Sequence, residues 1–314
     1  MGRILKTAAA LLGAAAAAEA AGSAYLYRRT MIRYNAKTER TMKMSGVDWE
    51  KYIPMMKERR EWMMQQPHED VWITSHDGLK LHGTYFKGDE GKKAVICFHG
   101  YTSEGLNDYG SLSNYYLKHG FRMLLVDLRA HGKSEGEHIG FGNMDRLDGA
   151  RWVDWMVGKA GSDVQILLHG NSMGSATVCM MSGLELPPQV KGIISDCAFT
   201  SMKDVFTHVL HSMYHIPAFP MLQLADWANK KKVGYGLDDL SSAREVKKAK
   251  VPFLFIHGED DVFVPCWMTE EIYKNCASPK TKLIVKGAGH GESYYKDTEA
   301  YEKAMDSFIG GIIK

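Results

Sequence analysis

The chain has 314 residues, of which 45% are apolar, so it is long enough to bury the core of one large domain or of two small ones. Its 39 lysines and arginines are nearly balanced by 37 aspartates and glutamates, which leaves a formal net charge of +2. Dedicated nucleic-acid-binding proteins carry a stronger basic excess, so we expect no nucleic-acid partner.

The N-terminal segment, residues 1–29, is rich in alanine and mostly apolar between residues 7 and 27. That stretch is long enough to span a bilayer, so we expect a retained membrane anchor. Two alternatives stay open: AEA at residues 18–20 fits the cleavage site of a secretory signal, which would make the protein secreted, and the run also fits a plain alanine-rich helix. Basic residues are more numerous after the run than before it, which favours a cytoplasmic position for the rest of the chain.

Residues 30–68 are charged and rich in methionine, and the stretch 49–67 has the pattern of an amphipathic helix. We expect this segment to form a helical neck between the anchor and a globular domain over residues 69–314. The methionines indicate packing rather than function, because this flexible side chain fills irregular gaps well.

From residue 69 onward, short apolar runs alternate with helical stretches. Two alternating runs flank Asp77-Gly78, which predicts a β-hairpin. The runs that follow it read as buried strands: AVICF, RMLLV, VQILL, KGIIS, PFLFI and KLIV. Strands that alternate with helices predict an α/β domain whose mainly parallel sheet has helices on both faces. Functional groups of such sheets lie in loops at the carboxyl ends of the strands.

One serine, Ser172, lies between two glycines directly after an apolar run, in GNSMG at residues 170–174. The segment matches G-x-S-x-G between a predicted strand and a predicted helix, which is the setting of a nucleophile elbow. There the hydroxyl of Ser172 projects from the sheet edge at a helix N-terminus, and the backbone N–H of Met173 is placed to stabilise an oxyanion. The alternative is that the glycines serve only close packing of strand and helix.

A serine hydroxyl needs a base to become a nucleophile at neutral pH, and the base needs an acid to orient it. His290 is the candidate base, because it follows the last predicted strand in a loop of small residues before the final helix. The segment HGEDDVFVP offers Glu259, Asp260 and Asp261 as candidate acids at the end of another strand. The chain order of serine, acid and histidine is that of the α/β-hydrolases.

Residues 69–314 resemble an α/β-hydrolase, closest to bacterial, N-terminally anchored serine hydrolases of the serine aminopeptidase-like and cinnamoyl-ester-hydrolase type. The resemblance rests on five motifs in order: HGYTSE (99–104), DLRAHGKSEG (127–136), GNSMG (170–174), HGEDDVFVP (257–265) and GAGHGES (287–293). It implies the α/β-hydrolase fold, with a mostly parallel eight-stranded sheet and a small helical cap after the sixth strand. It also implies that Asp261 is the acid and that the backbone N–H of Tyr101 is the second oxyanion donor.

The stretch over residues 199–247 interrupts the alternation of strands and helices. A surface loop of this length and apolar composition would be unusual, so we expect the stretch to form the cap over Ser172. Its inner face is expected to bind an acyl or aromatic group, with Met213, Tyr214 and Phe219 as candidate substrate contacts. The alternative is that these three side chains only pack the cap onto the sheet.

These residues lead to one functional hypothesis and two alternatives. The hypothesis is a serine hydrolase that cleaves carboxylic esters with Ser172 as nucleophile, His290 as base and Asp261 as orienting acid. An aminopeptidase or amidase would use the same triad, and a membrane-tethered binding protein would keep the fold without catalysis. We expect a small ester or acyl substrate and neither metal nor cofactor, because no ligand residues cluster in the sequence. The natural substrate and the oligomeric state stay open.

Overall fold

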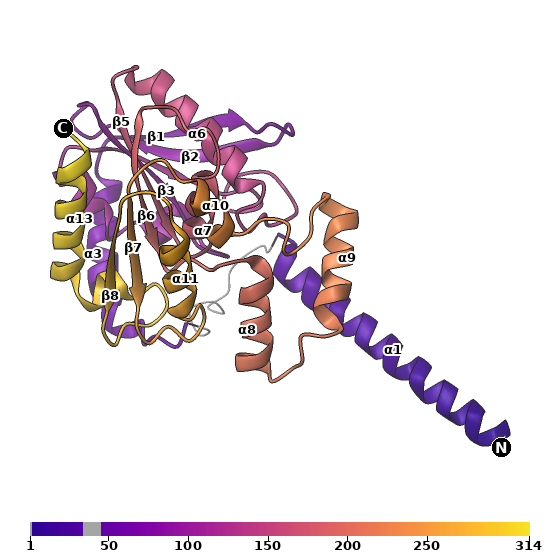
Figure 1. Ribbon diagram of the computed structural model, residues 1–314. Helices are drawn as coiled ribbons and strands as arrows, with labels where there is room; N and C mark the ends of the chain where they lie inside the picture. The colour runs from indigo at the N-terminus through magenta and orange to yellow at the C-terminus, as the bar shows by residue number, and fades with distance from the viewer. Residues whose placement is uncertain (1, 34–44) are drawn as a thin grey trace.

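A computed structural model describes residues 2–33 and 45–314 of the chain. Residues 34–44, which belong to the predicted neck, lie outside the described residues. Figure 1 shows a central sheet with helices on both faces, two helices that stand apart from the sheet, and a long N-terminal helix that leaves the body of the molecule.

The sheet has eight strands in the order β1-β2-β4-β3-β5-β6-β7-β8. The strands are β1 (His68–Thr74), β2 (Lys80–Phe86), β3 (Lys93–Phe98), β4 (Arg122–Val126), β5 (Gln165–Asn171), β6 (Val190–Asp196), β7 (Phe253–Gly258) and β8 (Lys280–Val285). β2 pairs antiparallel with both β1 and β4, and the other neighbours are parallel. The predicted hairpin and the mostly parallel eight-stranded sheet are therefore confirmed.

The helices fill the connections between these strands. They are α1 (Gly2–Met31), η1 (Glu50–Tyr52), α3 (Ile53–Met64), α4 (Gly105–Asp108), α5 (Ser113–Lys118), α6 (Asp145–Ala160), α7 (Met173–Met181), α8 (Met202–Tyr214), α9 (Met221–Val233), α10 (Ser242–Glu245), η2 (Val246–Lys248), α11 (Trp267–Asn275), α12 (Ser293–Lys296) and α13 (Thr298–Ile312). α8 and α9 lie between β6 and β7 in the chain, which is where the cap was expected.

The two faces of the sheet bury two separate cores, because successive side chains of a strand point to opposite faces. On β3, Ile96 and Phe98 contribute to the core under α6 and α7, whereas Val95 and Cys97 contribute to the core under α3, α5 and α13. Each buried strand is apolar on both faces for this reason, and its sequence reads as a continuous apolar run rather than as an alternating one.

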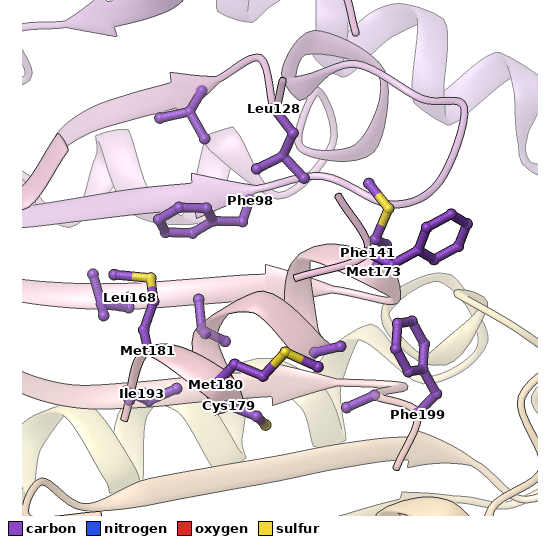
Figure 2. Packing of buried hydrophobic residues seen from close by; sticks show 14 of the residues in the cluster. Phe98, Leu128, Phe141, Leu168, Met173, Cys179, Met180, Met181, Ile193 and Phe199 are labelled. Atoms are coloured by element: carbon purple, nitrogen blue, oxygen red, sulfur yellow. The ribbon is translucent and has the colours of Figure 1, made fainter. Parts of the chain in front are cut away.

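The first core extends beyond the carboxyl ends of the strands. Figure 2 shows Leu168 and Ile193 packed between the strands and α7, with Phe141, Met173 and Phe199 gathered farther along at the strand ends. The aromatic rings there are close enough to interact, since the ring centroids of Phe141 and Phe199 are 6.4 Å apart. The apolar surface of the sheet therefore extends to the edge at which the predicted functional groups lie.

The predicted membrane anchor corresponds to most of α1, which continues to Met31. Within the described part of the chain, no helix is both long and apolar enough to cross a bilayer, so the predicted transmembrane helix finds no support in the structure. Alanine contributes little apolar surface, and Glu19 interrupts the run. The last turns of α1 pack against α9, beside which they lie in Figure 1.

Candidate active site

The backbone turns sharply between β5 and α7. β5 ends at Asn171, α7 begins at Met173, and Ser172 between them has φ 53° and ψ −111°. A side-chain-bearing residue at positive φ is strained, and such strain persists only where the surrounding structure enforces it. The N–H of Ser172 donates to the carbonyl oxygen of Asp196 at 2.9 Å, which ties the turn to the end of β6.

Two glycines make this turn possible. A Cβ atom added to Gly174 would lie 1.9 Å from the carbonyl oxygen of Phe98, and one added to Gly170 would lie 2.3 Å from the carbonyl oxygen of Gly174. Both obstacles are backbone atoms, which cannot rotate away as the end of a side chain can. The glycines therefore allow close packing of strand and helix, as the alternative interpretation of the GNSMG segment expected. The same close packing also positions Ser172.

We expect Gly174→Ala to lower the free energy of unfolding by more than about 2 kcal/mol or to prevent folding, because the added methyl group overlaps backbone atoms. The matched control is Gly158→Ala in α6, where an added Cβ meets no atom within 4 Å. This control should stabilise the helix by about 0.5–1 kcal/mol. Urea unfolding of both variants checks the difference, and equal midpoints would show that the turn tolerates a side chain.

The structure brings the predicted serine and histidine together. The Oγ atom of Ser172 lies 2.8 Å from Nε2 of His290, although the two residues are far apart in the sequence. Both are largely buried, with 6% and 8% of their surface exposed, so little water competes for this hydrogen bond. When Nε2 carries no proton it accepts the serine hydroxyl proton, which is the arrangement that nucleophile activation requires.

The other ring nitrogen of His290 contacts Asp261. The distance from Nδ1 to Oδ2 of the carboxylate is 2.7 Å, and Oδ1 of Asp261 accepts the backbone N–H groups of Phe263 at 2.9 Å and Val264 at 2.8 Å. A carboxylate held by these donors keeps the proton of the imidazole on Nδ1 and leaves Nε2 free to accept. Asp261 therefore fixes both the orientation and the tautomer of His290.

The charges of this pair support each other. Burial raises the pKa of Asp261, but His290 and His257 lower it by more, and the pKa of the carboxyl lies well below its usual range. Burial lowers the pKa of His290, but the charge of Asp261 raises it by more, and the pKa of the imidazole lies above its ordinary value. The carboxylate is thus ionised at neutral pH and favours the imidazolium that forms when the histidine takes up a proton.

The other two candidate acids lie elsewhere. Glu259 and Asp260 are exposed, whereas Asp261 is 5% exposed. Asp260 is fixed through its backbone, whose N–H donates to the carbonyl oxygen of Ala288 at 2.9 Å. Successive residues of this turn point in different directions, and only Asp261 is directed at His290.

A second histidine contacts the same carboxylate, and sequence reasoning assigned it no role. Nε2 of His257 lies 3.2 Å from Oδ2 of Asp261 and 2.7 Å from the carbonyl oxygen of Val264, while its Nδ1 lies 2.7 Å from the hydroxyl of Thr269. A proton on Nε2 satisfies both oxygens, and Nδ1 then accepts from Thr269. The signal in the sequence was the position of His257 at the end of a strand, four residues before Asp261.

The predicted oxyanion donors flank the serine. A Cβ added to Gly100 would lie 3.3 Å from the Cβ of Ser172, so the loop that carries Tyr101 passes close to the nucleophile. Asp108, which sequence reasoning missed, holds this loop to the turn, because its Oδ2 accepts the N–H of Gly100 at 2.6 Å and the side-chain amide of Asn171 at 3.0 Å. Tyr101 and Met173 both line the cavity that contains Ser172.

Two cavities meet at Ser172, and they differ in character. The apolar cavity lies under the cap, where its wall comes mainly from aliphatic and aromatic side chains. The second cavity lies on the side of α3 and the loop after β3, and its lining mixes apolar side chains with polar and charged ones, among them Lys57, Arg60 and Asp108. Because both cavities include Ser172, the serine lies where two separate compartments meet.

The three predicted cap contacts have different positions. Tyr214 lines the apolar cavity, whereas Met213 and Phe219 are not among the described residues that line it. Phe219 is 71% exposed and precedes α9 on the outside of the cap. Other cap residues that line the cavity include Val205, Phe206, Val209 and Leu210 of α8 and Met221, Leu222 and Ala225 of α9.

Two groups of metal-ligating side chains occur among the described residues. One consists of Cys197, Asp261 and His290, and the last two already bind each other in the serine site. The other consists of His76, Asp77 and Asp148. The guanidinium of Arg129 pairs with both carboxylates of that second group at 3.0 and 2.7 Å, so a cation is already in place there.

We expect Asp261→Asn to reduce kcat for ester cleavage by about 10⁴, because an amide stabilises the wrong tautomer of His290. Asp260→Asn is the matched control, since it makes the same chemical change on the adjacent exposed residue, and it should change kcat by less than about tenfold. Steady-state kinetics of the two variants side by side, after equal unfolding midpoints have been established, checks the assignment. A larger loss of kcat in Asp260→Asn than in Asp261→Asn would contradict the assignment.

The comparisons with known proteins agree with this architecture. A family model described as the alpha/beta hydrolase fold matches residues 93–220 of the chain. The uncharacterized protein YqkD of Bacillus subtilis (strain 168) is 29% identical over 237 residues, which cover 76% of this chain and 77% of that protein.

Two solved structures share the fold. The esterase Pf2001 of Pyrococcus furiosus superposes with a TM-score of 0.65 at 21% sequence identity, over 81% of this chain and 94% of that one. The alpha/beta hydrolase GrgF from Penicillium sp. sh18 has a TM-score of 0.62 at 18% identity, over 79% of this chain and 99% of that one. At these identities the likeness is one of fold.

Proposed function

Because the chain belongs to the α/β-hydrolase superfamily, we propose that it is a serine hydrolase that cleaves carboxylic esters through an acyl-enzyme on Ser172. The observation that carries the proposal is the continuous hydrogen-bonded chain from Ser172 through His290 to Asp261, with distances of 2.8 and 2.7 Å. The fold alone would not specify an activity, since one fold supports many functions.

In the proposed acylation step, Oγ of Ser172 attacks the ester carbonyl carbon while Nε2 of His290 takes the hydroxyl proton. The backbone N–H groups of Tyr101 and Met173 stabilise the negative oxygen of the tetrahedral intermediate. Asp261 stabilises the imidazolium, which then gives its proton to the departing alcohol as the carbon–oxygen bond breaks.

In the proposed deacylation step, water takes the place of the alcohol. His290 removes a proton from the water as its oxygen attacks the acyl carbon, and the same two N–H groups stabilise the second tetrahedral intermediate. The imidazolium returns its proton to Oγ of Ser172 when the bond to the acyl group breaks, which releases the acid and restores the enzyme. The chain supplies every group in this cycle, and water is the co-reactant.

We expect Ser172→Ala to lower kcat for p-nitrophenyl ester cleavage by about 10⁵ or more without changing the unfolding midpoint. A fluorophosphonate probe should label the parent chain at Ser172 and leave the variant unlabelled. A variant that retains more than a tenth of the activity would contradict the proposal. The p-nitroanilide of the same acyl group is the parallel substrate, and faster cleavage of the anilide than of the ester would assign an amidase instead.

We expect kcat/KM to rise with pH through one ionisation above about 6.5, because neutral His290 is the base and Asp261 raises its pKa. Asp261→Asn removes that charge, so the midpoint of the profile should move to lower pH. Asp196 also faces His290, and burial raises the pKa of Asp196 to about 6. A midpoint that moves with Asp196→Asn and stays in place with Asp261→Asn would contradict His290 as the base.

A further inference from the structure

We infer that the last turns of α1 form one wall of the acyl-binding cavity, and that the substrate carries an extended apolar acyl chain that lies against this wall. The inference rests on the proposed ester cleavage at Ser172 and names the substrate class of that site. It concerns the stretch Ser23–Met31 of α1, here called the α1 wall.

The α1 wall has one buried face. Ser23, Tyr27 and Met31 are spaced by four residues, so they lie on the same side of the helix, and they are 4%, 5% and 1% exposed. Leu26 lies on this side and is partly buried, whereas Tyr25 on the opposite side is 60% exposed. A helix with one buried face packs that face against apolar side chains, and here those side chains belong to the cap.

The buried face of the α1 wall belongs to the cavity that contains Ser172. Leu26, Tyr27 and Met31 line this cavity together with residues of α8 and α9. No described residue that lines the cavity carries a charged side chain. A charged acyl group would lose its hydration there without gaining a partner of opposite charge, whereas a hydrocarbon chain would gain contacts with the mainly apolar wall.

Backbone hydrogen bonds fix the end of α1 to the hydrolase domain. The carbonyl oxygen of Met31 accepts the N–H of Ile139 at 2.8 Å, and the N–H of Arg33 donates to the carbonyl oxygen of Glu137 at 2.6 Å. The guanidinium of Arg33 donates to the carbonyl oxygens of Ser134 at 2.5 Å and of Gly132 at 2.7 Å. The α1 wall is therefore held in place from its C-terminal end.

Two side-chain contacts join the α1 wall to the cap and to the oxyanion loop. The hydroxyl of Tyr27 donates to Oδ1 of Asn229 in α9 at 3.0 Å, in a buried position. The hydroxyl of Tyr101 donates to the carbonyl oxygen of Arg29 at 3.4 Å, so the residue that supplies a proposed oxyanion donor also contacts α1. The wall thus connects the cap with the reacting end of the cavity.

The length of the α1 wall favours an acyl chain of extended conformation. The stretch from Ser23 to Met31 advances about 12 Å at 1.5 Å per residue. A zigzag of carbon–carbon bonds near 1.5 Å advances roughly 1.3 Å per carbon, so about nine carbons match the length of the wall. Each methylene that enters the cavity should raise kcat/KM about fourfold until the cavity is filled.

The test compares p-nitrophenyl esters from acetate to dodecanoate on the full chain and on three variants. For the parent we expect the decanoate to exceed the acetate in kcat/KM by at least tenfold. Leu26→Trp should lower this ratio at least tenfold and move the preferred length to shorter chains, because the indole occupies the cavity. Leu26→Ala should move the preference to longer chains. Tyr25→Trp is the matched control on the exposed face and should leave the profile unchanged.

The preferred chain length should shift in opposite directions in Leu26→Trp and Leu26→Ala. A general loss of stability would not produce such opposite shifts. A chain-length profile that is the same in the parent and in both Leu26 variants would overturn the inference. So would a change of equal size in Tyr25→Trp, because that side chain lies outside the cavity.

A binding experiment separates this inference from the proposed reaction. Two proteins, the Ser172→Ala variant and the double variant that also carries Leu26→Trp, are each titrated with decanoate and with acetate. Calorimetry follows the binding. We expect decanoate to bind at least tenfold more tightly than acetate, and Leu26→Trp to abolish the difference. If the parent cleaves no ester but this binding is observed, the proposed function fails, and the α1 wall remains only as part of a binding site for an apolar chain. Ester cleavage without any Leu26-dependent binding would leave the proposed function in place and overturn the inference.

Discussion

The backbones of β5, α7 and β3 approach so closely around Ser172 that no side chain fits at Gly170 or Gly174. This close approach determines the position of everything else in the site. It places the serine directly before α7 with its hydroxyl in contact with His290, and it brings the ends of β3 and β6 beside the nucleophile. The parallel sheet then adds the acid from the end of β7 and the histidine from the loop after β8.

Electrostatics around Asp261 complete the arrangement. The carboxylate is buried, yet it stays ionised because two backbone N–H groups, His290 and His257 compensate for the lost water. Removal of a single partner would leave a buried charge partly unpaired, which is costly. The proposed mechanism therefore relies on a carboxylate that does not change protonation state while the histidine beside it does.

Much of this could be predicted from the sequence, because the strands are buried on both faces and end in short motifs. Ser172, Asp261 and His290 each follow a recognisable strand, and the structure brings them together. The orientation of the cap helices could not be predicted, since an amphipathic pattern shows that a helix has a buried face but not which cavity that face lines. Met213 of α8 does not line the cavity, and Phe219 lies in the connection between α8 and α9. The packing of α1 was missed because its alanine-rich run was interpreted as an anchor, which concealed the buried stripe at its end.

The central claim is that Ser172 becomes acylated during turnover. The most direct measurement is to mix the full chain with a p-nitrophenyl ester, quench with acid within seconds, and determine the mass of the intact protein and of its peptides. The account predicts an increase equal to one acyl group, located on the peptide that contains Ser172 and absent from the Ser172→Ala protein. Release of p-nitrophenol without an acyl group on Ser172, or with the acyl group on another residue, would contradict it.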